Sequence, residues 1–317
     1  MKIVFMGTPD FAVPILDKLV KNNYNIVAVI TAPDKPSGRG LKMSHSAVKQ
    51  YALEHQLHVL QPEKLKNNDF VNELRALEAD LQIVVAFRML PEVVWKMPPK
   101  GTFNLHASLL PQYRGAAPIN YAIINGEKTT GVTTFFLSHE IDTGNVIMQQ
   151  TCTIGPDETA GELHDKLMHL GSETVLKTVQ LIEKNEAKSI PQQQLMVGEL
   201  KVAHKIFKDD CNIVWDNDAL TLHNFIRGLS PFPTAFTNLI FENSESILFK
   251  IYKAAYELTS HSKPTGSIES DGKTFLKVAC KNGFINLLQV QMAGKKAMTI
   301  QEFLRGFDVN KIKMMGT

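Results

Sequence analysis

The sequence predicts a two-part α/β protein, in which a mostly parallel sheet covered by helices is followed by a smaller β-barrel. Three observations support this. As far as residue 183, short apolar strands alternate with segments of helical periodicity, which indicates a parallel sheet with helices on both faces. Beyond residue 206, short β-branched and aromatic runs separated by turn residues follow one another. At 317 residues the chain is long enough for two cores.

The first part begins with apolar strands that end in turns. In chain order, its expected elements are strand 2–6, helix 10–21, strand 25–31, helices 44–56 and 67–78, strands 81–87, 101–106, 131–137 and 145–153, and helix 159–183. Helix 10–21 places Phe11, Ile15 and Leu19 at helical spacing. Ligands of open parallel sheets bind beyond the carboxyl ends of the strands, so we expect a site at that edge.

The second part has evenly spaced short strands after one helix. The expected elements are helix 218–229 and strands 235–241, 247–254, 266–269, 274–279 and 284–291. The polar, aperiodic stretch between the two parts contains Pro191 and is typical of a linker. We therefore predict a catalytic domain at 1–187, a linker at 188–205 and a C-terminal domain at 206–317.

Composition excludes several classes. Hydrophobic residues make up 44% of the chain and charged residues 21%, which is ordinary for a globular protein. No apolar run approaches the ~20 residues of a membrane helix, and the N-terminal apolar stretch is too short for a signal peptide. Cys152, Cys211 and Cys280 form no CxxC pair, which argues against a zinc site and favours a reducing, cytoplasmic location. We expect no metal and no membrane partner.

The stretch from Phe103 to Pro118 carries the most chemistry. Asn104 and His106 are two residues apart on an expected strand, so both side chains leave the same face. A neutral hydrogen-bond donor can stabilise negative charge developing on oxygen, and an imidazole can handle protons, which are the requirements of acyl transfer. Asp142 lies in the downstream turn Glu140–Gly144 and is a candidate for orienting the imidazole.

These motifs resemble those of the folate-dependent formyltransferases, and within them the branch that formylates methionine on initiator tRNA. The resemblance rests on NLHASLLPQYRGAAP, IDTGNVI, FMGTPDFAVP and APDKPSGRGLKM, and on HKIFKDDCNIVW and IRGLSPFPTAF in the second part. It implies a Rossmann-like sheet domain and an OB-like, tRNA-binding barrel. It also implies 10-formyltetrahydrofolate as the formyl donor and initiator methionyl-tRNA as the acceptor.

The resemblance assigns roles residue by residue. Asn104, His106 and Asp142 match the catalytic trio. Ser108, Leu109, Leu110 and Pro111 match a folate-contacting loop, which would give a flat pterin an apolar wall. The chain departs from the commoner family pattern at Phe87-Arg88, where a Tyr-Gly-like pair is usual, so the pterin contacts there are left open. How proton transfer divides between His106 and Asp142 is also open.

A basic, glycine-rich loop resembles the loop with which the tRNA-formylating members of the family reach the acceptor end of the tRNA. Gly38 and Gly40 flank Arg39, and on the resemblance Arg39 and Lys42 are expected tRNA contacts. Residues 201–317 carry 15 Lys/Arg against 11 Asp/Glu, a mild excess that suits phosphate binding. Nothing in the sequence indicates an obligate dimer, and we expect a monomer.

Three other interpretations stay open at this point. An amino-sugar-nucleotide formyltransferase would share the trio and a similar C-terminal domain. A noncatalytic folate- or tRNA-binding module would have no need of the trio. An NAD-dependent enzyme is disfavoured because Gly7-Thr8-Pro9 lacks the GxGxxG pattern.

Overall fold

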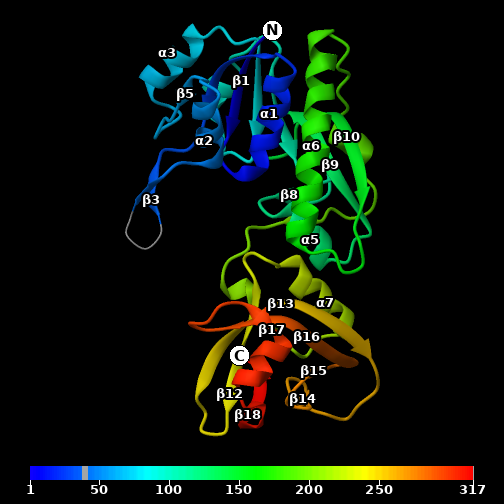
Figure 1. Cartoon of the computed structure of the whole chain (residues 1–317). Helices are drawn as coiled ribbons and strands as arrows, with labels where there is room; N and C mark the ends of the chain where they lie inside the picture. The colour runs from blue at the N-terminus through cyan, green and yellow to red at the C-terminus, as the bar shows by residue number, and fades with distance from the viewer. Residues whose placement is uncertain (38–41, 317) are drawn as a thin grey trace. The chain divides into compact units, whose positions relative to one another are not determined.

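The computed structural model describes residues 1–37 and 42–316. The chain divides into two compact units. Unit 1 comprises residues 1–115, 129–152 and 164–202, and unit 2 comprises residues 116–128, 153–163 and 203–317. Both units are therefore assembled from segments that are distant in sequence, as the colours in Figure 1 show.

Unit 1 is built on one sheet with the strand order β10-β9-β7-β6-β1-β2-β5. Its strands are β1 (Lys2–Gly7), β2 (Asn25–Ile30), β5 (Val59–Leu60), β6 (Leu81–Val85), β7 (Thr102–His106), β9 (Thr129–Phe136) and β10 (Val146–Thr153). All neighbours from β5 to β7 are parallel, and β9 runs antiparallel to β7. The predicted mostly parallel sheet is confirmed.

Helices follow the strands of unit 1. They are α1 (Val13–Lys21), α2 (Ala47–Glu54), α3 (Asn68–Ala76), α4 (Glu92–Trp95) and the long α6 (Ala160–Glu183), which begins in unit 2. The start of α2 agrees with N-capping chemistry, because the Ser46 hydroxyl accepts from the Lys49 amide at 3.1 Å. Pro14 at the start of α1 occupies a position where no intrahelical N–H bond is lost.

Shorter elements complete unit 1. They are the 3₁₀ turns η1 (Asp10–Ala12) and η2 (Gln192–Leu195), the ribbon of β3 (Lys35–Ser37) and β4 (Lys42–Ser44), and the two-residue strand β8 (Arg114–Gly115). The two-residue strand β11 (Val202–Ala203) begins in unit 1 and ends in unit 2.

The two faces of the unit 1 sheet are buried by different helices. Val4 and Met6 lie on one face and pack in a cluster that includes Phe70 and Leu74 of α3. Leu105 faces the other side, where α6 passes so closely that a β-carbon at Gly171 would lie 2.7 Å from the Leu105 side chain. Successive strand residues alternate between faces, so the even-numbered Asn104 and His106 of β7 lie opposite Leu105.

Unit 2 contains an antiparallel sheet that nearly closes on itself, with the order β14-β15-β16-β13-β12-β18 and β17 added to β16. Its strands are β12 (Ala235–Phe241), β13 (Ser246–Leu258), β14 (Ile268–Ser270), β15 (Leu276–Cys280), β16 (Gly283–Met292), β17 (Met298–Thr299) and β18 (Ile312–Gly316). At the ends of the order, the Met315 amide of β18 donates to the Gly266 carbonyl beside β14 at 2.8 Å. The predicted OB-like barrel is confirmed.

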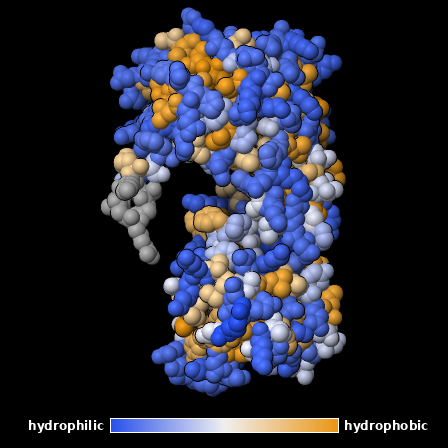
Figure 2. Space-filling view, viewed as in Figure 1, coloured by the Kyte–Doolittle hydropathy of each residue, from blue (hydrophilic) through white to orange (hydrophobic). Residues whose placement is uncertain are grey.

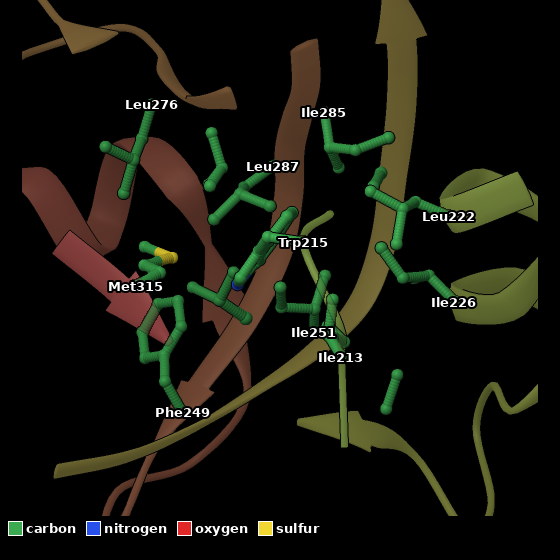
Figure 3. Close-up of a cluster of buried hydrophobic side chains, with 14 of the residues drawn as sticks. Ile213, Trp215, Leu222, Ile226, Phe249, Ile251, Leu276, Ile285, Leu287 and Met315 are labelled. Carbon is green, nitrogen blue, oxygen red and sulfur yellow. The ribbon is translucent and has the colours of Figure 1, made fainter. Parts of the chain in front are cut away.

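Helices α5 (Pro118–Ile124), α7 (Ala219–Gly228) and α8 (Ile300–Gly306), with the turns η3 (Asp209–Cys211) and η4 (Val309–Lys311), accompany the barrel. Figure 3 shows its core, in which Trp215 lies among side chains from β13, β15, β16, β18 and α7. Trp215 is 5% exposed, and its indole N–H donates to the Thr237 hydroxyl at 3.1 Å, which satisfies the only polar group of the ring.

The visible surface is mostly hydrophilic, with apolar residues in separate groups (Figure 2). Within residues 1–37 and 42–316, no helix has the length and apolarity needed to span a membrane.

Candidate active site

The candidate site begins at the carboxyl end of β7, a central strand of the unit 1 sheet. Asn104 pairs with Val84 of β6 and with Phe135 of β9, and His106 pairs with Thr133 of β9. This pairing on both sides fixes the β7 backbone. The two side chains therefore leave a rigid strand rather than a loop, at the edge where the sequence predicts a site.

The His106 ring is buried, and each of its two nitrogens faces an oxygen of the protein. The residue is 6% exposed, and Nε2 lies 2.8 Å from the Tyr113 carbonyl oxygen. A carbonyl can only accept, so Nε2 carries the hydrogen and the neutral ring has its lone pair at Nδ1. Nδ1 lies 3.8 Å from Oδ2 of Asp142. The structure thus brings the histidine and the aspartate together across 36 residues of sequence.

Asp142 lies in a turn that is held by hydrogen bonds to other parts of unit 1. Its Oδ2 accepts from the Gly115 amide at 3.0 Å, which ties the turn to the loop after β7. Its φ is +55°, a left-handed conformation that is uncommon for a residue with a β-carbon. Gly144 is required two residues later, because a β-carbon there would lie 1.7 Å from the Phe136 carbonyl oxygen.

The Asn104 carboxamide is the member of the group that has no hydrogen-bond partner within the described residues. Asn104 is half-buried, and across residues 1–37 and 42–316 its side chain makes no hydrogen bond. A half-buried amide without a protein partner has its N–H groups available to water or to a ligand. This fits a donor aimed at an oxyanion.

Gln192 of η2 is part of the site and was missed by sequence reasoning. Only 1% of it is exposed, and its Nε2 donates to the carbonyl oxygens of Asp142 at 2.8 Å and Gly144 at 2.9 Å. Its Oε1 accepts from Arg114 Nη2 at 2.7 Å and Nε at 3.1 Å. In sequence it lies in a polar stretch typical of a linker, and Pro191 before it is the only local signal of a fixed position.

The expected folate loop is partly engaged by the protein itself. Ser108 is fully buried and its hydroxyl donates to the Gln112 carbonyl at 2.6 Å. Leu110 is 1% exposed and packs in a cluster with Phe135 and Val146, and Pro111 is buried. Leu109 is half-buried. Of the four side chains, Leu109 is the most open to a ligand.

The end of β6 leads into the Phe87-Arg88 pair. Ala86 adopts a φ of +47°, another left-handed position next to the site edge. Arg88 folds back on the protein, where Nη1 donates to the Glu63 carbonyl at 2.7 Å and Nη2 to the Pro62 carbonyl. Met89 is 69% exposed. The arginine therefore braces a neighbouring loop instead of leaving its guanidinium free.

The remaining sequence candidates are placed as follows. Arg39 lies outside the described residues. Lys42 is the first residue of β4, whose backbone pairs with Ser37 of β3. No cluster of three or more His, Cys, Asp and Glu side chains suited to a metal ion occurs in residues 1–37 and 42–316.

Chemically, the site offers an unpartnered amide donor, an imidazole with an available lone pair, and a carboxylate beside that lone pair. This combination suits attack of a nucleophile on a carbonyl carbon, with charge stabilisation by the amide and proton handling by the imidazole.

Comparison with known proteins agrees with that class. Residues 1–179 match the family described as formyl transferase, and residues 205–308 match the formyl transferase C-terminal domain. The chain belongs to the formyl transferase family, a family of enzymes.

Its full-length relatives are methionyl-tRNA formyltransferases. The protein of that name from Bacteroides fragilis is 55% identical over 98% of this chain and 96% of its own length. The one from Flavobacterium johnsoniae is 54% identical over 96% of each chain.

Solved structures share the fold at lower identity. WlaRD, a sugar 3N-formyl transferase, matches 93% of this chain and 99% of its own with a TM-score of 0.65 at 22% identity. HypX from Aquifex aeolicus has the same TM-score at 18% identity, over 99% of this chain and 48% of its own.

Proposed function

We propose that this chain transfers the formyl group of 10-formyltetrahydrofolate to the amino group of methionyl initiator tRNA, giving N-formylmethionyl-tRNA for translation initiation. The observation that supports this most is the 55% identity to a methionyl-tRNA formyltransferase, which extends over 98% of the chain. The likeness therefore includes unit 2 as well as the unit that carries the site. A shared catalytic unit alone would leave the acceptor undefined.

The proposed reaction is an acyl transfer between two nitrogens. The methionine amine attacks the formyl carbon, and a carbon–nitrogen bond forms while the formyl oxygen gains negative charge. The bond from that carbon to N10 of the folate then breaks, and the proton lost by the amine is delivered to N10. The products are the formylated aminoacyl-tRNA and tetrahydrofolate, and no other reactant is consumed.

Asn104 is the proposed oxyanion donor. Its carboxamide leaves a rigid strand and has no partner in the described part of the chain, so it can turn its N–H toward the formyl oxygen without breaking an existing bond. The paired backbone of β7 holds the residue in place before the reaction, so only the side chain has to turn to meet the developing charge.

His106 is the proposed proton carrier and Asp142 its electrostatic partner. The Nε2–H is committed to the Tyr113 carbonyl, so the proton from the amine would arrive at Nδ1. There the imidazolium would face Asp142 Oδ2 at 3.8 Å, a distance that suits charge stabilisation in a buried setting. In this division of roles Asp142 remains ionised and takes up no proton.

Folate is proposed to contact the segment Ser108–Pro111 and the turn that carries Asp142. Because Ser108 and Leu110 have their side chains inside the protein, Leu109 and backbone groups would make the contacts from that segment. A pocket of about 480 Å³ opens along the turn, lined by Phe136, Glu140 and neighbouring residues. The pocket is lined by turn residues on either side of Asp142 in sequence, which makes this turn a candidate wall for the ring.

The acceptor is proposed to contact Arg39 and Lys42 and a basic groove of unit 2. That groove measures about 670 Å³ and includes Lys205, Lys208 and Lys250. Phe232 also lines it and is 81% exposed. Cations combined with an open aromatic face suit single-stranded RNA, which is bound through phosphates and base stacking.

The test is transfer of labelled formyl from 10-formyltetrahydrofolate to methionyl initiator tRNA. His106→Ala should lower kcat by roughly 10²- to 10⁴-fold. Arg39→Ala should mainly raise KM for tRNA, and His58→Ala, at an exposed histidine, should change neither. Transfer to an amino sugar nucleotide instead of tRNA would keep the chemistry and discard the acceptor. Absence of transfer to any acceptor would favour a noncatalytic module.

A further inference from the structure

Residues 190–201, here called the strap, contact two segments near His106. One is the loop that follows β7, and the other is the turn that carries Asp142. At the start of the strap, Ile190 forms a two-bond antiparallel bridge with Val146 of β10, each bond 2.8 Å. At its end, the Lys201 carbonyl accepts from the Tyr113 amide at 2.6 Å. The Gln112 side chain adds bonds to the carbonyls of Val197 and Glu199. The strap is thus fixed at both ends on unit 1.

Gln192 is the point at which the strap reaches the site. Its carboxamide makes four hydrogen bonds: Nε2 donates twice to the Asp142 turn, and Oε1 accepts twice from Arg114. At 1% exposure these bonds do not compete with water. A buried, fully paired amide of this kind specifies one geometry, because every lost bond leaves a buried polar group unsatisfied.

The geometry that Gln192 specifies is that of the Asp142 carboxylate. Asp142 holds a left-handed φ of +55°, a conformation that costs energy and persists because surrounding contacts impose it. The Gln192 Nε2 group donates to the backbone carbonyls of Asp142 and Gly144, on either side of Thr143. In the turn held by these two bonds, Asp142 Oδ2 accepts from the Gly115 amide at 3.0 Å and lies 3.8 Å from His106 Nδ1.

We propose that Gln192 is a positioning residue that holds the Asp142 carboxylate in place beside His106. Gln192 acts through Asp142 and does not contact the reacting atoms. The inference rests on the proposed function for its kinetic readout, so a structural readout is needed as well. The Gly115 amide supplies one, because its protection depends on the orientation of Asp142.

The kinetic experiment compares Gln192→Ala, Gln192→Glu and the control Gln194→Ala. Gln194 lies in the same 3₁₀ turn but is exposed. Gln192→Glu keeps the shape and the acceptor for Arg114, but turns a carboxylate oxygen toward the two carbonyls. Both Gln192 variants should lower kcat by about 10- to 100-fold, as misplacement of a catalytic group does, with KM values within about 3-fold of wild type. Gln194→Ala should match wild type.

Two further readouts separate positioning from general damage to the fold. In an Asp142→Asn background, Gln192→Ala should cause little additional loss, because its effect passes through the missing carboxylate. In ¹⁵N-labelled protein, hydrogen exchange of the Gly115 amide should be faster in both Gln192 variants and unchanged in Gln194→Ala.

The inference is overturned if the Gln192 variants are as active as Gln194→Ala, if the losses multiply in the double variant, or if Gly115 exchange is unchanged. Should wild type fail to formylate tRNA, the proposed function falls, and Gly115 exchange alone then decides the role of Gln192. Should Gln192→Ala not fold, the isosteric Gln192→Glu carries the same readouts.

Discussion

Replacing Asn104 should separate activity from stability. In Asn104→Ala the carboxamide is lost from a strand that keeps all its backbone pairing. Loss of one preorganised oxyanion donor costs on the order of 10²–10³ in kcat, which is about 2.7–4 kcal/mol of transition-state stabilisation. Because the Asn104 side chain has no hydrogen-bond partner among the described residues, its removal should leave the free energy of unfolding within about 0.5 kcal/mol.

A matched control on the same strand should show the opposite pattern. Thr102 is 3% exposed, and its hydroxyl lies 2.7 Å from the Trp95 carbonyl and 3.1 Å from Gln82 Oε1. Thr102→Val keeps the shape but leaves these buried groups unpaired, at a cost of about 1–3 kcal/mol. Its kcat should stay near that of wild type, because the side chain contacts no proposed substrate position.

The assay is steady-state formyl transfer with both substrates varied, paired with urea unfolding of each variant. Asn104→Asp should be included, because it keeps the size of the side chain and replaces the donor by a carboxylate oxygen. A kcat within about 3-fold of wild type in both Asn104 variants would refute the oxyanion role. A large stability loss in Asn104→Ala would refute the reading of its carboxamide as unpartnered.

Three further changes have defined outcomes. Gly144→Ala would place a β-carbon 1.7 Å from the Phe136 carbonyl oxygen, so the Asp142 turn must shift and kcat should fall by roughly 10- to 100-fold; unaltered kinetics would contradict this. Phe249→Ala removes a fully buried ring of the barrel and should cost unit 2 about 3–5 kcal/mol in urea unfolding, against no change in the unit 1 transition. Burial lowers the pKa of His223, so the unfolded chain binds a proton at this side chain more readily than the folded protein does. The free energy of unfolding should therefore be independent of this group above about pH 6.5 and decrease below that pH. His223→Gln should remove this part of the decrease when unfolding is measured as a function of pH.

The fold was predictable because its signals are local. Strand 235–241 was predicted with the bounds of β12, since alternating apolar residues and flanking turn residues mark both ends. Helix 10–21 was predicted as one helix, and the structure divides it into η1 and α1 at Val13, next to Pro14. The short ribbon of β3 and β4 and the helix α4 were not predicted, because three- and four-residue elements carry no measurable periodicity.

Only those site residues could be predicted that follow from strand geometry or belong to a sequence motif. A two-residue spacing places Asn104 and His106 on one face whatever the surroundings, and a turn motif supplies Asp142. Gln192 has no such local mark, because a glutamine in a proline-flanked polar run has the same sequence pattern whether it is solvated or buried. Its burial is decided by the Ile190–Val146 bridge, a contact between residues 44 positions apart. Residues that act by holding others are set by tertiary contacts, so the strap is where structure adds most to the sequence. If Gln192 acts as inferred, its substitution will alter kcat although it belongs to none of the motifs that the sequence reveals.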